Sequence, residues 1–294
     1  MKRIKENPYY PVTYNPEMEE EACLQDGRVP YLYFPALKAF PFLRHGFSTR
    51  LGGVSEGIFA SMNLGYGRGD EDACVNENYK RIGEAIGFDT KDLIFSDQVH
   101  DTKLHVVTAQ DRHSGVLQEK KLAGIDGLVT NEPGLVLATT YADCVPLYFV
   151  DPVHRAIGLS HSGWKGTVGK IGEKTLEVMA REFGTRPEEV TVLIGPSICA
   201  SCYEVGEEVA EQFRRAFPGK SGEGLLFAKG DGKYQLDLWL ACKHTLEEAG
   251  VPAGQIKISE ICTCHNPELL YSHRASHGQR GSLMAFLEII RPES

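Results

Sequence analysis

The chain has 294 residues, of which 42% are hydrophobic and 24% are charged. This composition is ordinary for a globular protein with a sizeable core, and no Pro- or Ser-rich linker divides the sequence, so we expect a single domain over residues 1–294. The formal net charge of −9 argues against a general nucleic-acid binder, which needs a positive field over the phosphates.

The sequence also argues against membrane insertion and secretion. Its basic first seven residues are followed by prolines and acidic residues, so we expect no signal peptide, and no apolar run is long enough to span a bilayer. The eight cysteines lack the spacing of a small secreted disulfide scaffold. We therefore expect a cytoplasmic protein, whose state as a monomer or homodimer stays open.

Short apolar, β-branched runs bounded by Gly, Pro or Asp predict strands. In chain order they are Leu32–Phe34, Leu104–Thr108, Gly127–Thr130, Leu135–Thr139, Pro146–Val150, Ala156–Ser160 and Val190–Ile194. Apolar residues at three- and four-residue spacing predict helices. They are Glu77–Ile86, Lys170–Phe183, Glu207–Phe217 and Leu236–Ala249. Strands and helices mix without strict alternation, which favours an α/β (α+β) sandwich over a doubly wound sheet.

Turn and loop signals refine this picture. Pro133-Gly134 predicts a tight turn that makes residues 125–139 a hairpin. The glycine-rich segment 65–70 follows a polar stretch rather than a buried strand, so a dinucleotide site is not expected there. The loop 50–57 begins with Arg50 and can bring backbone N–H groups and a guanidinium to an anion, with a plain surface turn as the alternative.

Three potential metal ligands, His100, Cys144 and His161, each follow an apolar run and lie beside small or turn-forming residues. Zinc accepts imidazole and thiolate, and three protein ligands leave one position for water or substrate, as in catalytic sites. His105 and His154 are interpreted as strand or loop residues beside the site. Because strand ends that meet at one edge of a sheet form a usual site for chemistry, we expect the three ligands to converge there.

Cys199-Ala200-Ser201-Cys202 is formally a C-x-x-C motif, which is found in redox-active and zinc sites. A thioredoxin-type motif opens a helix early in a βαβ unit, whereas this one follows a late strand. The sequence therefore favours two ordinary cysteines.

Ten short motifs occur in one order along most of the chain. They are His45–Arg50, Gly52–Ser55, Asn63–Gly65, Gln98–His100, Asp126–Thr130, Ala142–Pro146, His161–Gly166, Ile194–Ile198, Cys202–Gly206 and Cys262-Thr263. In this combination the chain resembles the laccase-domain family, which is also described as multicopper polyphenol oxidoreductase-like and as a bacterial purine nucleoside phosphorylase family. Ser162, His273 and Gln279 depart from the residues usual in that family.

The resemblance implies a mixed β-sandwich flanked by helices, with a cysteine-hydrolase-like fold. It implies a zinc site formed by His100, Cys144 and His161, with copper as the alternative metal. It also implies phosphorolysis of adenosine, inosine and methylthioadenosine to free base and (methylthio)ribose 1-phosphate, with deamination of adenosine as a further activity.

The catalytic candidates are the three zinc ligands and Asp143, which orients a ligand, acts as an acid or base, or caps backbone N–H groups. For phosphate and substrate the candidates are Arg50, Lys165, Arg274 and Asn63, because guanidinium and ammonium groups bind phosphate oxygens by charge-assisted hydrogen bonds. Arg50→Ala is expected to raise the phosphate requirement far more than it disturbs folding.

Two other activities remain open. In the first, Cys144 is the nucleophile of a hydrolase of amide or ester bonds, with His161 or His100 as its base. The family resemblance implies an amino acid wrongly added to a peptidoglycan precursor as the substrate of such a hydrolase. In the second, the protein is a copper-dependent polyphenol oxidase, which ranks lower because the chain lacks the His-x-His pairs of a trinuclear copper cluster. A non-enzymatic binding module ranks last.

Overall fold

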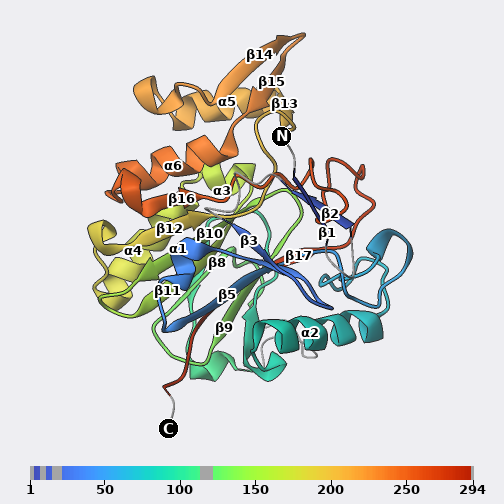
Figure 1. Ribbon diagram of the computed structural model, residues 1–294. Coiled ribbons are helices and arrows are strands. Elements are labelled where there is room, and N and C mark those ends of the chain that lie inside the picture. The colour runs from blue at the N-terminus through green and yellow to red at the C-terminus, as the bar shows by residue number, and fades with distance from the viewer. Residues whose placement is uncertain (1–2, 7–10, 15–21, 113–121, 293–294) are drawn as a thin grey trace.

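The computed structural model describes residues 3–6, 11–14, 22–112 and 122–292, and its centre is a pair of six-stranded sheets (Figure 1). The first sheet has the strand order β3 (Cys23–Gln25), β4 (Tyr31–Tyr33), β5 (Leu43–Ser48), β17 (Leu283–Ile289), β9 (Val136–Tyr141) and β6 (Leu93–Phe95). The second has the order β16 (Ile256–Ile258), β12 (Thr191–Ile194), β10 (Val145–Asp151), β11 (Ala156–Ser162), β8 (Gly127–Thr130) and β7 (Leu104–Val106). Both sheets mix parallel and antiparallel pairs.

The two sheets pack face to face around one continuous hydrophobic cluster. Phe34 and Phe47, from the side of the first sheet, share this cluster with Leu128 and Tyr148 from the second. The hydroxyl of Tyr148 donates a hydrogen bond across the interface to the carbonyl of Gly46, at 3.1 Å. The expected mixed β-sandwich is therefore confirmed, whereas the expectation of a single domain over residues 1–294 stays a prediction.

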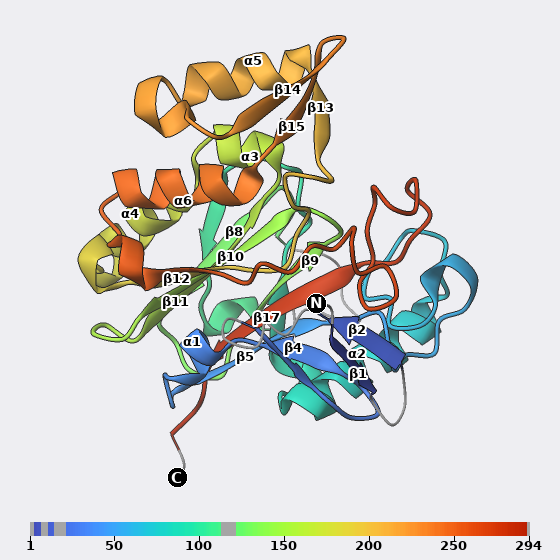
Figure 2. The ribbon, with the colours of Figure 1, turned by 45° about the horizontal axis from the view of Figure 1, so that its top comes forward.

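Helices cover the outer faces of both sheets. On the second sheet lie α3 (Trp164–Val168), α4 (Ile171–Phe183) and α6 (Leu238–Glu248), and α2 (Asp72–Ile86) covers the first (Figure 2). Both faces of β10 are covered, so the strand is buried along its whole length. Its sequence is accordingly a nearly continuous apolar run. A short α1 (Pro35–Lys38) precedes β5.

Two smaller units complete the structure. Strands β13 (Glu204–Gly206), β15 (Lys233–Leu236) and β14 (Leu226–Gly230) form a three-stranded sheet, and α5 (Glu207–Ala216) packs beside it at the top of Figure 1. Strands β1 (Arg3–Glu6) and β2 (Pro11–Tyr14) pair with each other. No helix in the described ranges has both the length and the apolar character to cross a membrane.

Most predicted elements exist within two residues of their predicted bounds, but α2 begins five residues earlier, at Asp72, and the predicted hairpin over residues 125–139 is wrong. Strands β8 and β9 belong to opposite sheets, so the turn at Gly134, whose φ is +74°, carries the chain across the sandwich. The turn signal was correct, but a turn does not specify which strand becomes the hydrogen-bonding neighbour.

Candidate functional site

His100, Cys144 and His161 converge at one end of the sandwich. His100 follows β6 of the first sheet, Cys144 lies in the link from β9 to β10, and His161 is part of β11 in the second sheet. One potential ligand atom from each residue lies within 4.8 Å of the others. The predicted grouping is therefore present, but it lies between the ends of two sheets and not at one edge of a single sheet.

Asp126, which directly precedes β8, organises this group. Its Oδ1 accepts hydrogen bonds from His161 Nδ1 at 2.8 Å and from the backbone N–H of His100 at 3.0 Å. Its Oδ2 accepts from the backbone N–H groups of Val99 and Asp101 at 3.1 and 3.0 Å. Burial raises the pKa of Asp126, but the hydrogen bonds and the nearby His161 outweigh burial, so the pKa is lowered and the carboxylate is charged.

Asp126 was absent from the predicted site residues, although it lies in a motif that carries the family resemblance. The available signal was an Asp immediately before a fully buried strand, where a carboxylate needs hydrogen-bond donors. The donors are the backbone N–H groups of residues 99–101, and the sequence alone does not show that these residues lie close to Asp126.

Gly163 packs directly against the side chains of His100 and Cys144. A Cβ at this position would lie 2.9 Å from Cδ2 of His100 and 3.2 Å from Sγ of Cys144. Its φ of −72° is open to any residue, so the requirement for glycine comes from packing against the potential ligands and not from backbone conformation.

Two residues of the site have left-handed backbone. His100 has φ of +62° and Asp143, beside Cys144, has φ of +86°. Left-handed non-glycine residues store conformational strain and concentrate at functional sites. The surrounding hydrogen bonds hold both: Asp126 fixes the N–H of His100, and the carbonyl of Asp143 accepts from the N–H of Ile198 at 3.0 Å.

The carboxylate of Asp143 is engaged by the C-terminal loops. Its Oδ1 accepts from the hydroxyl of Thr263 at 2.6 Å, and its Oδ2 accepts from the backbone N–H of Arg274 at 2.7 Å. Of the roles left open by the sequence, the structure shows the capping of a backbone N–H group. The catalytic role of Asp143 stays a prediction.

Cys144 and His161 influence each other strongly. Burial raises the pKa of the Cys144 thiol, but the neighbouring His161 and the hydrogen bond from His100 outweigh burial and lower the pKa to about 6. Burial lowers the pKa of His161, but the Cys144 thiolate and the hydrogen bond to Asp126 outweigh burial and raise the pKa to about 9. Without a bound ion, the two side chains therefore form a thiolate and imidazolium pair near neutral pH.

The guanidinium of Arg50 faces the protein backbone. Its Nε and Nη2 donate to the carbonyl of Ala60 at 3.0 and 2.9 Å, and Nη1 donates to the carbonyl of Pro267 at 2.8 Å. The guanidinium carbon also lies 4.7 Å from the ring centre of Tyr271. Arg50 thus ties its glycine-rich loop to the C-terminal loops, and its role in phosphate binding stays a prediction.

Lys165 and Arg274, which were also predicted to bind phosphate, differ in their exposure and in their hydrogen-bond partners. Lys165 is exposed in the first turn of α3, four residues after His161, with its ammonium 5.6 Å from the ring centre of Trp164. Arg274 donates to the carbonyls of Cys202 and Glu204 at 3.2 and 3.0 Å. Of the three predicted cations Arg50, Lys165 and Arg274, Lys165 is the most exposed.

Asn63 is completely buried and uses all four of its hydrogen-bonding positions within the protein. Its amide donates to Asp70 Oδ2 at 2.8 Å and to the carbonyl of Gly65 at 3.2 Å. Its Oδ1 accepts from the N–H groups of Gly65 and Ser282 at 3.0 and 2.9 Å. Asn63 therefore shapes the loop 65–70, and direct substrate binding by this residue stays a prediction.

That loop carries Arg68, which the sequence did not single out as a site residue. Arg68 lines a pocket of about 430 Å³, a size suited to a small molecule, together with Gln98, Thr140 and Ser282. Arg280 donates from Nη1 to the hydroxyl of Ser282 at 3.2 Å, and its buried Nε has no partner among the described residues. Burial and the nearby Arg68 lower the pKa of Arg280 to about 10, while Asp143 and Cys144 act in the opposite direction.

His105 and His154 have carboxylate partners outside this group. His105 Nε2 lies 3.1 Å from Asp111 Oδ1, and His154 Nδ1 lies 2.8 Å from Asp151 Oδ2. Neither belongs to the His100, Cys144 and His161 group, in agreement with their interpretation as strand or loop residues.

Known proteins provide an independent comparison. Residues 44–290 match the family described as multi-copper polyphenol oxidoreductase laccase. The chain is 38% identical over 243 residues to the purine nucleoside phosphorylase YlmD of Bacillus subtilis strain 168, covering 82% of this chain and 87% of that protein. It is 34% identical over 231 residues to the adenosine deaminase RL5 of an unknown prokaryotic organism, covering 78% and 87%.

A solved structure supports the fold as well. The crystal structure of YlmD from Geobacillus stearothermophilus superimposes with a TM-score of 0.86 at 35% identity, over 91% of this chain and 98% of that one. The similarity of fold therefore extends over most of the chain.

Proposed function

Because this chain belongs to the multi-copper polyphenol oxidoreductase laccase family, in which relatives named purine nucleoside phosphorylase and adenosine deaminase occur, we propose that it is a zinc-dependent purine nucleoside phosphorylase. Its substrates are adenosine, inosine and methylthioadenosine, which phosphate cleaves to the free base and a (methylthio)ribose 1-phosphate. Deamination of adenosine is a second activity of the same site.

The three side chains fit zinc. Two imidazoles and one thiolate are donors that zinc prefers, and they leave a fourth position open. His161 Nδ1 is bound to Asp126, which leaves Nε2 as the ligating atom and gives the carboxylate–histidine arrangement usual at zinc. Exposure increases from buried His161 through Cys144 to exposed His100, so solvent reaches the group from the side of His100.

The donor set argues against a multicopper oxidase. A trinuclear copper cluster needs many imidazoles, whereas the candidate metal groups in the described part of the chain contain two at most, His100 and His161. One thiolate with two imidazoles suits a single ion. Zinc is the proposed metal and copper the alternative.

Phosphorolysis requires a site for phosphate and another for the nucleoside. The side chains proposed for phosphate are Lys165, Arg68 and Arg280, because Lys165 and Arg68 are exposed cations and Arg280 has a buried N–H donor that no residue in the described ranges accepts. The 430 Å³ pocket beside Arg68 is proposed to take the nucleoside. Bound zinc supplies Lewis acidity to an oxygen at this site.

Asp143 and Asp126 are proposed to position the reacting groups. Asp126 fixes the ring of His161 and the backbone of His100, and Asp143 anchors the backbone beside Cys144 to the loop that contains Arg274. A carboxylate that already accepts two short hydrogen bonds is well placed to hold geometry. Arg274 and Asn63 support the site through their contacts with backbone groups.

The observation that carries the proposal is the buried Asp126–His161 pair directed at Cys144 and His100. The test is to incubate metal-analysed protein with adenosine or inosine, with and without phosphate, and to measure free base and ribose 1-phosphate by chromatography. Release that depends on phosphate and is lost in Cys144→Ala is expected. No release from either nucleoside contradicts the proposal.

One observation favours a second candidate function. The thiolate and imidazolium pair of Cys144 and His161 resembles an activated cysteine nucleophile, which supports a hydrolase acting on amide or ester bonds, such as an amino acid wrongly attached to a peptidoglycan precursor. The metal content separates the two functions, because a thiolate bound to zinc is a poor nucleophile. Metal-free protein that retains full hydrolytic activity favours the hydrolase.

A further inference from the structure

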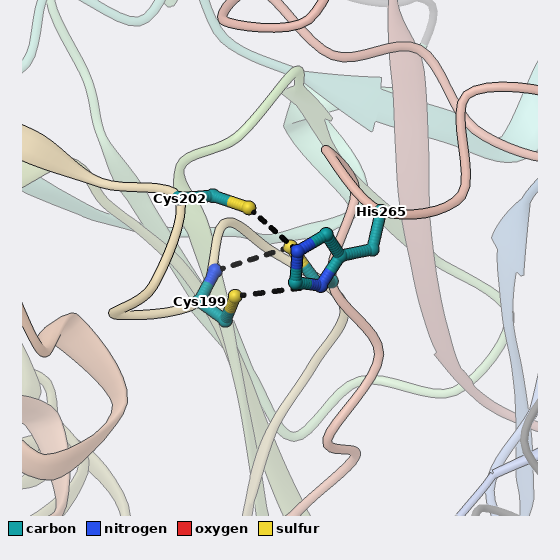
Figure 3. Close-up of side chains that lie close together, drawn as sticks. Cys199, Cys202 and His265 are labelled. Carbon is teal, nitrogen blue, oxygen red and sulfur yellow. Dashed lines mark hydrogen bonds between the residues drawn. The ribbon is translucent and has the colours of Figure 1, made fainter.

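A second group of metal-binding side chains lies outside the site described above. Cys199 and Cys202 are in the link between β12 and β13, and Cys262 and His265 are in the loop that follows β16. Figure 3 shows Cys199, Cys202 and His265 directed toward one another from these two loops. The sequence favoured two ordinary cysteines at positions 199 and 202, whereas the structure places both beside Cys262 and His265.

The spacing and the geometry both suit a structural metal. The two loops contribute a Cys-x-x-Cys and a Cys-x-x-His, and short spacings of this kind are typical of the ligand pairs in structural zinc sites. One ligand atom from each residue lies within 4.8 Å of the others, and two thiolates on one tetrahedral zinc lie about 3.8 Å apart. We propose that Cys199, Cys202, Cys262 and His265 bind a second zinc ion, which has a structural role.

The ring of His265 lies between two of the thiols. Nδ1 is 3.8 Å from Cys199 Sγ and Nε2 is 3.0 Å from Cys202 Sγ (Figure 3). A tetrahedral ion uses one of these nitrogens, so binding requires the ring to turn. His265 is exposed, and this leaves room for the movement. Four ligands close the coordination sphere, which is the pattern of a structural site and contrasts with the three at Cys144.

The two loops are already joined by backbone pairing next to the proposed ligands. The N–H of Ser197 donates to the carbonyl of Ile261, and the N–H of Thr263 donates to the carbonyl of Ser197, each at 3.1 Å. The N–H of Cys199 also lies 3.4 Å from Cys262 Sγ, in the manner of backbone support for a thiolate. The ion thus adds a cross-link at a junction that the backbone has already formed.

This junction leads directly to the catalytic site. Thr263, next to Cys262, donates its hydroxyl to Asp143, which precedes Cys144. On the other loop, the carbonyl of Cys202 accepts from Arg274, whose own N–H donates to Asp143. Both loops that hold the second ion therefore meet at Asp143, and loss of that ion is expected to loosen the backbone at Cys144.

The first measurement is the zinc content of purified protein by elemental mass spectrometry. Two zinc ions per chain are expected in the wild type, and one in each of Cys144→Ala and Cys199→Ser. Cys74→Ser, which removes a thiol on α2 away from both groups, is the matched control and is expected to retain two. A wild type with one zinc that Cys199→Ser retains and Cys144→Ala loses overturns the proposal.

Cobalt substitution gives a readout that does not depend on activity. Three of the four proposed ligand thiolates belong to the second site and one to the first. The thiolate-to-cobalt absorption is therefore expected to fall by roughly three quarters in Cys199→Ser and by roughly one quarter in Cys144→Ala. Equal losses in the two variants contradict the assignment.

Two further results separate folding defects and oxidation from metal loss. His265→Ala changes only an exposed ring and is expected to release its second zinc at a lower chelator concentration than the wild type. An unchanged chelator profile overturns the proposal. A disulfide within the group, seen as a mass two hydrogens lower with no zinc bound, also overturns it. Because Cys144 is unaffected in His265→Ala, failure of this proposal leaves the phosphorylase proposal standing.

Discussion

Asp126 is hydrogen bonded to both histidine ligands of the candidate zinc site, through the ring of His161 and through the backbone N–H of His100. A single carboxylate therefore sets the orientation of one imidazole and the backbone position of the other. Its four hydrogen bonds occupy both oxygens, so no other side chain of similar size reproduces the arrangement.

Asp126→Asn is expected to weaken zinc binding by about 10- to 100-fold, the usual effect of losing a carboxylate behind a ligating histidine. The NH2 group of Asn must face two of the four N–H donors, so the free energy of unfolding also falls, by roughly 1–3 kcal/mol for each donor left unpaired. Chelator competition and urea unfolding measure the two effects. Asp89→Asn, which alters only the exposed cap at Lys91, is the control. Wild-type zinc affinity in Asp126→Asn contradicts the role of this carboxylate.

Gly163→Ala is expected to impair the first metal site while leaving the fold intact. The added methyl would lie 2.9 Å from the His100 ring, and overpacking of this kind costs about 1–3 kcal/mol. Zinc affinity and nucleoside cleavage are therefore expected to fall about tenfold or more. Gly206→Ala is the matched control, because its Cβ meets no atom within 4 Å and its φ of −88° is also unstrained. Equal behaviour of the two variants would show that the ligands tolerate the methyl.

Arg280→Ala is expected to raise the KM for phosphate by roughly 10- to 100-fold, because a charge-assisted hydrogen bond contributes about 1.5–3 kcal/mol. The kcat at saturating phosphate is expected to change less. Initial rates over a phosphate series with inosine measure both. An unchanged KM removes Arg280 from the phosphate site.

Arg50→Ala gives a direct contrast. The guanidinium of Arg50 donates three hydrogen bonds to backbone carbonyls. Its loss is therefore expected to lower the thermal midpoint, in addition to any change in the KM for phosphate. The comparison of thermal midpoint and phosphate KM in Arg50→Ala and Arg280→Ala decides which guanidinium binds phosphate. A raised KM with an unchanged midpoint in Arg50→Ala supports the sequence-based prediction for Arg50.

His45 makes folding sensitive to acid. Its Nε2 accepts from the backbone N–H of Phe34 at 2.9 Å, and burial lowers its pKa to about 4, whereas His in an unfolded chain has a pKa of about 6.5. The unfolded chain therefore binds a proton first, and stability that is full above pH 6.5 is lost as the pH falls toward 4. This amounts to about 2 kcal/mol at pH 5.

Urea unfolding of the wild type and of His45→Gln at pH 7 and pH 5 measures this effect. Gln retains an acceptor for the Phe34 N–H but does not titrate in this range. The drop in unfolding free energy between the two pH values is expected to be larger in the wild type by about 2 kcal/mol. Equal drops contradict a titration of His45.

The sequence predicted what depends on local pattern. Strand β8, which is buried along its whole length, is predicted with its exact bounds from its apolar run. Helix α4 is predicted within one residue from the periodicity of its buried face. His100, Cys144 and His161 also lie close together, as expected from soft ligands beside turn-forming residues, but between two sheets and not at one edge of a single sheet.

Contacts between distant segments account for what the sequence missed. Cys199 lies beside His265, which is 66 residues later in the chain, and this contact makes Cys199 a potential metal ligand. Arg50 donates a hydrogen bond to a backbone carbonyl in the C-terminal loops. The hairpin prediction failed for the same reason: Gly134 specifies a turn, but β9 pairs with β6 and with β17 near the C-terminus, not with β8. Pairing across such separations is decided by burial in three dimensions.

Strand β17 occupies the middle of the first sheet, between β5 and β9, with hydrogen bonds to both. During synthesis on the ribosome, the edges of β5 and β9 that pair with β17 therefore lack hydrogen-bond partners until residue 289 has left the exit tunnel. Such edges are templates for pairing between chains. A nascent or prematurely terminated chain that lacks this strand is expected to need a chaperone, because the first sheet cannot be completed without β17.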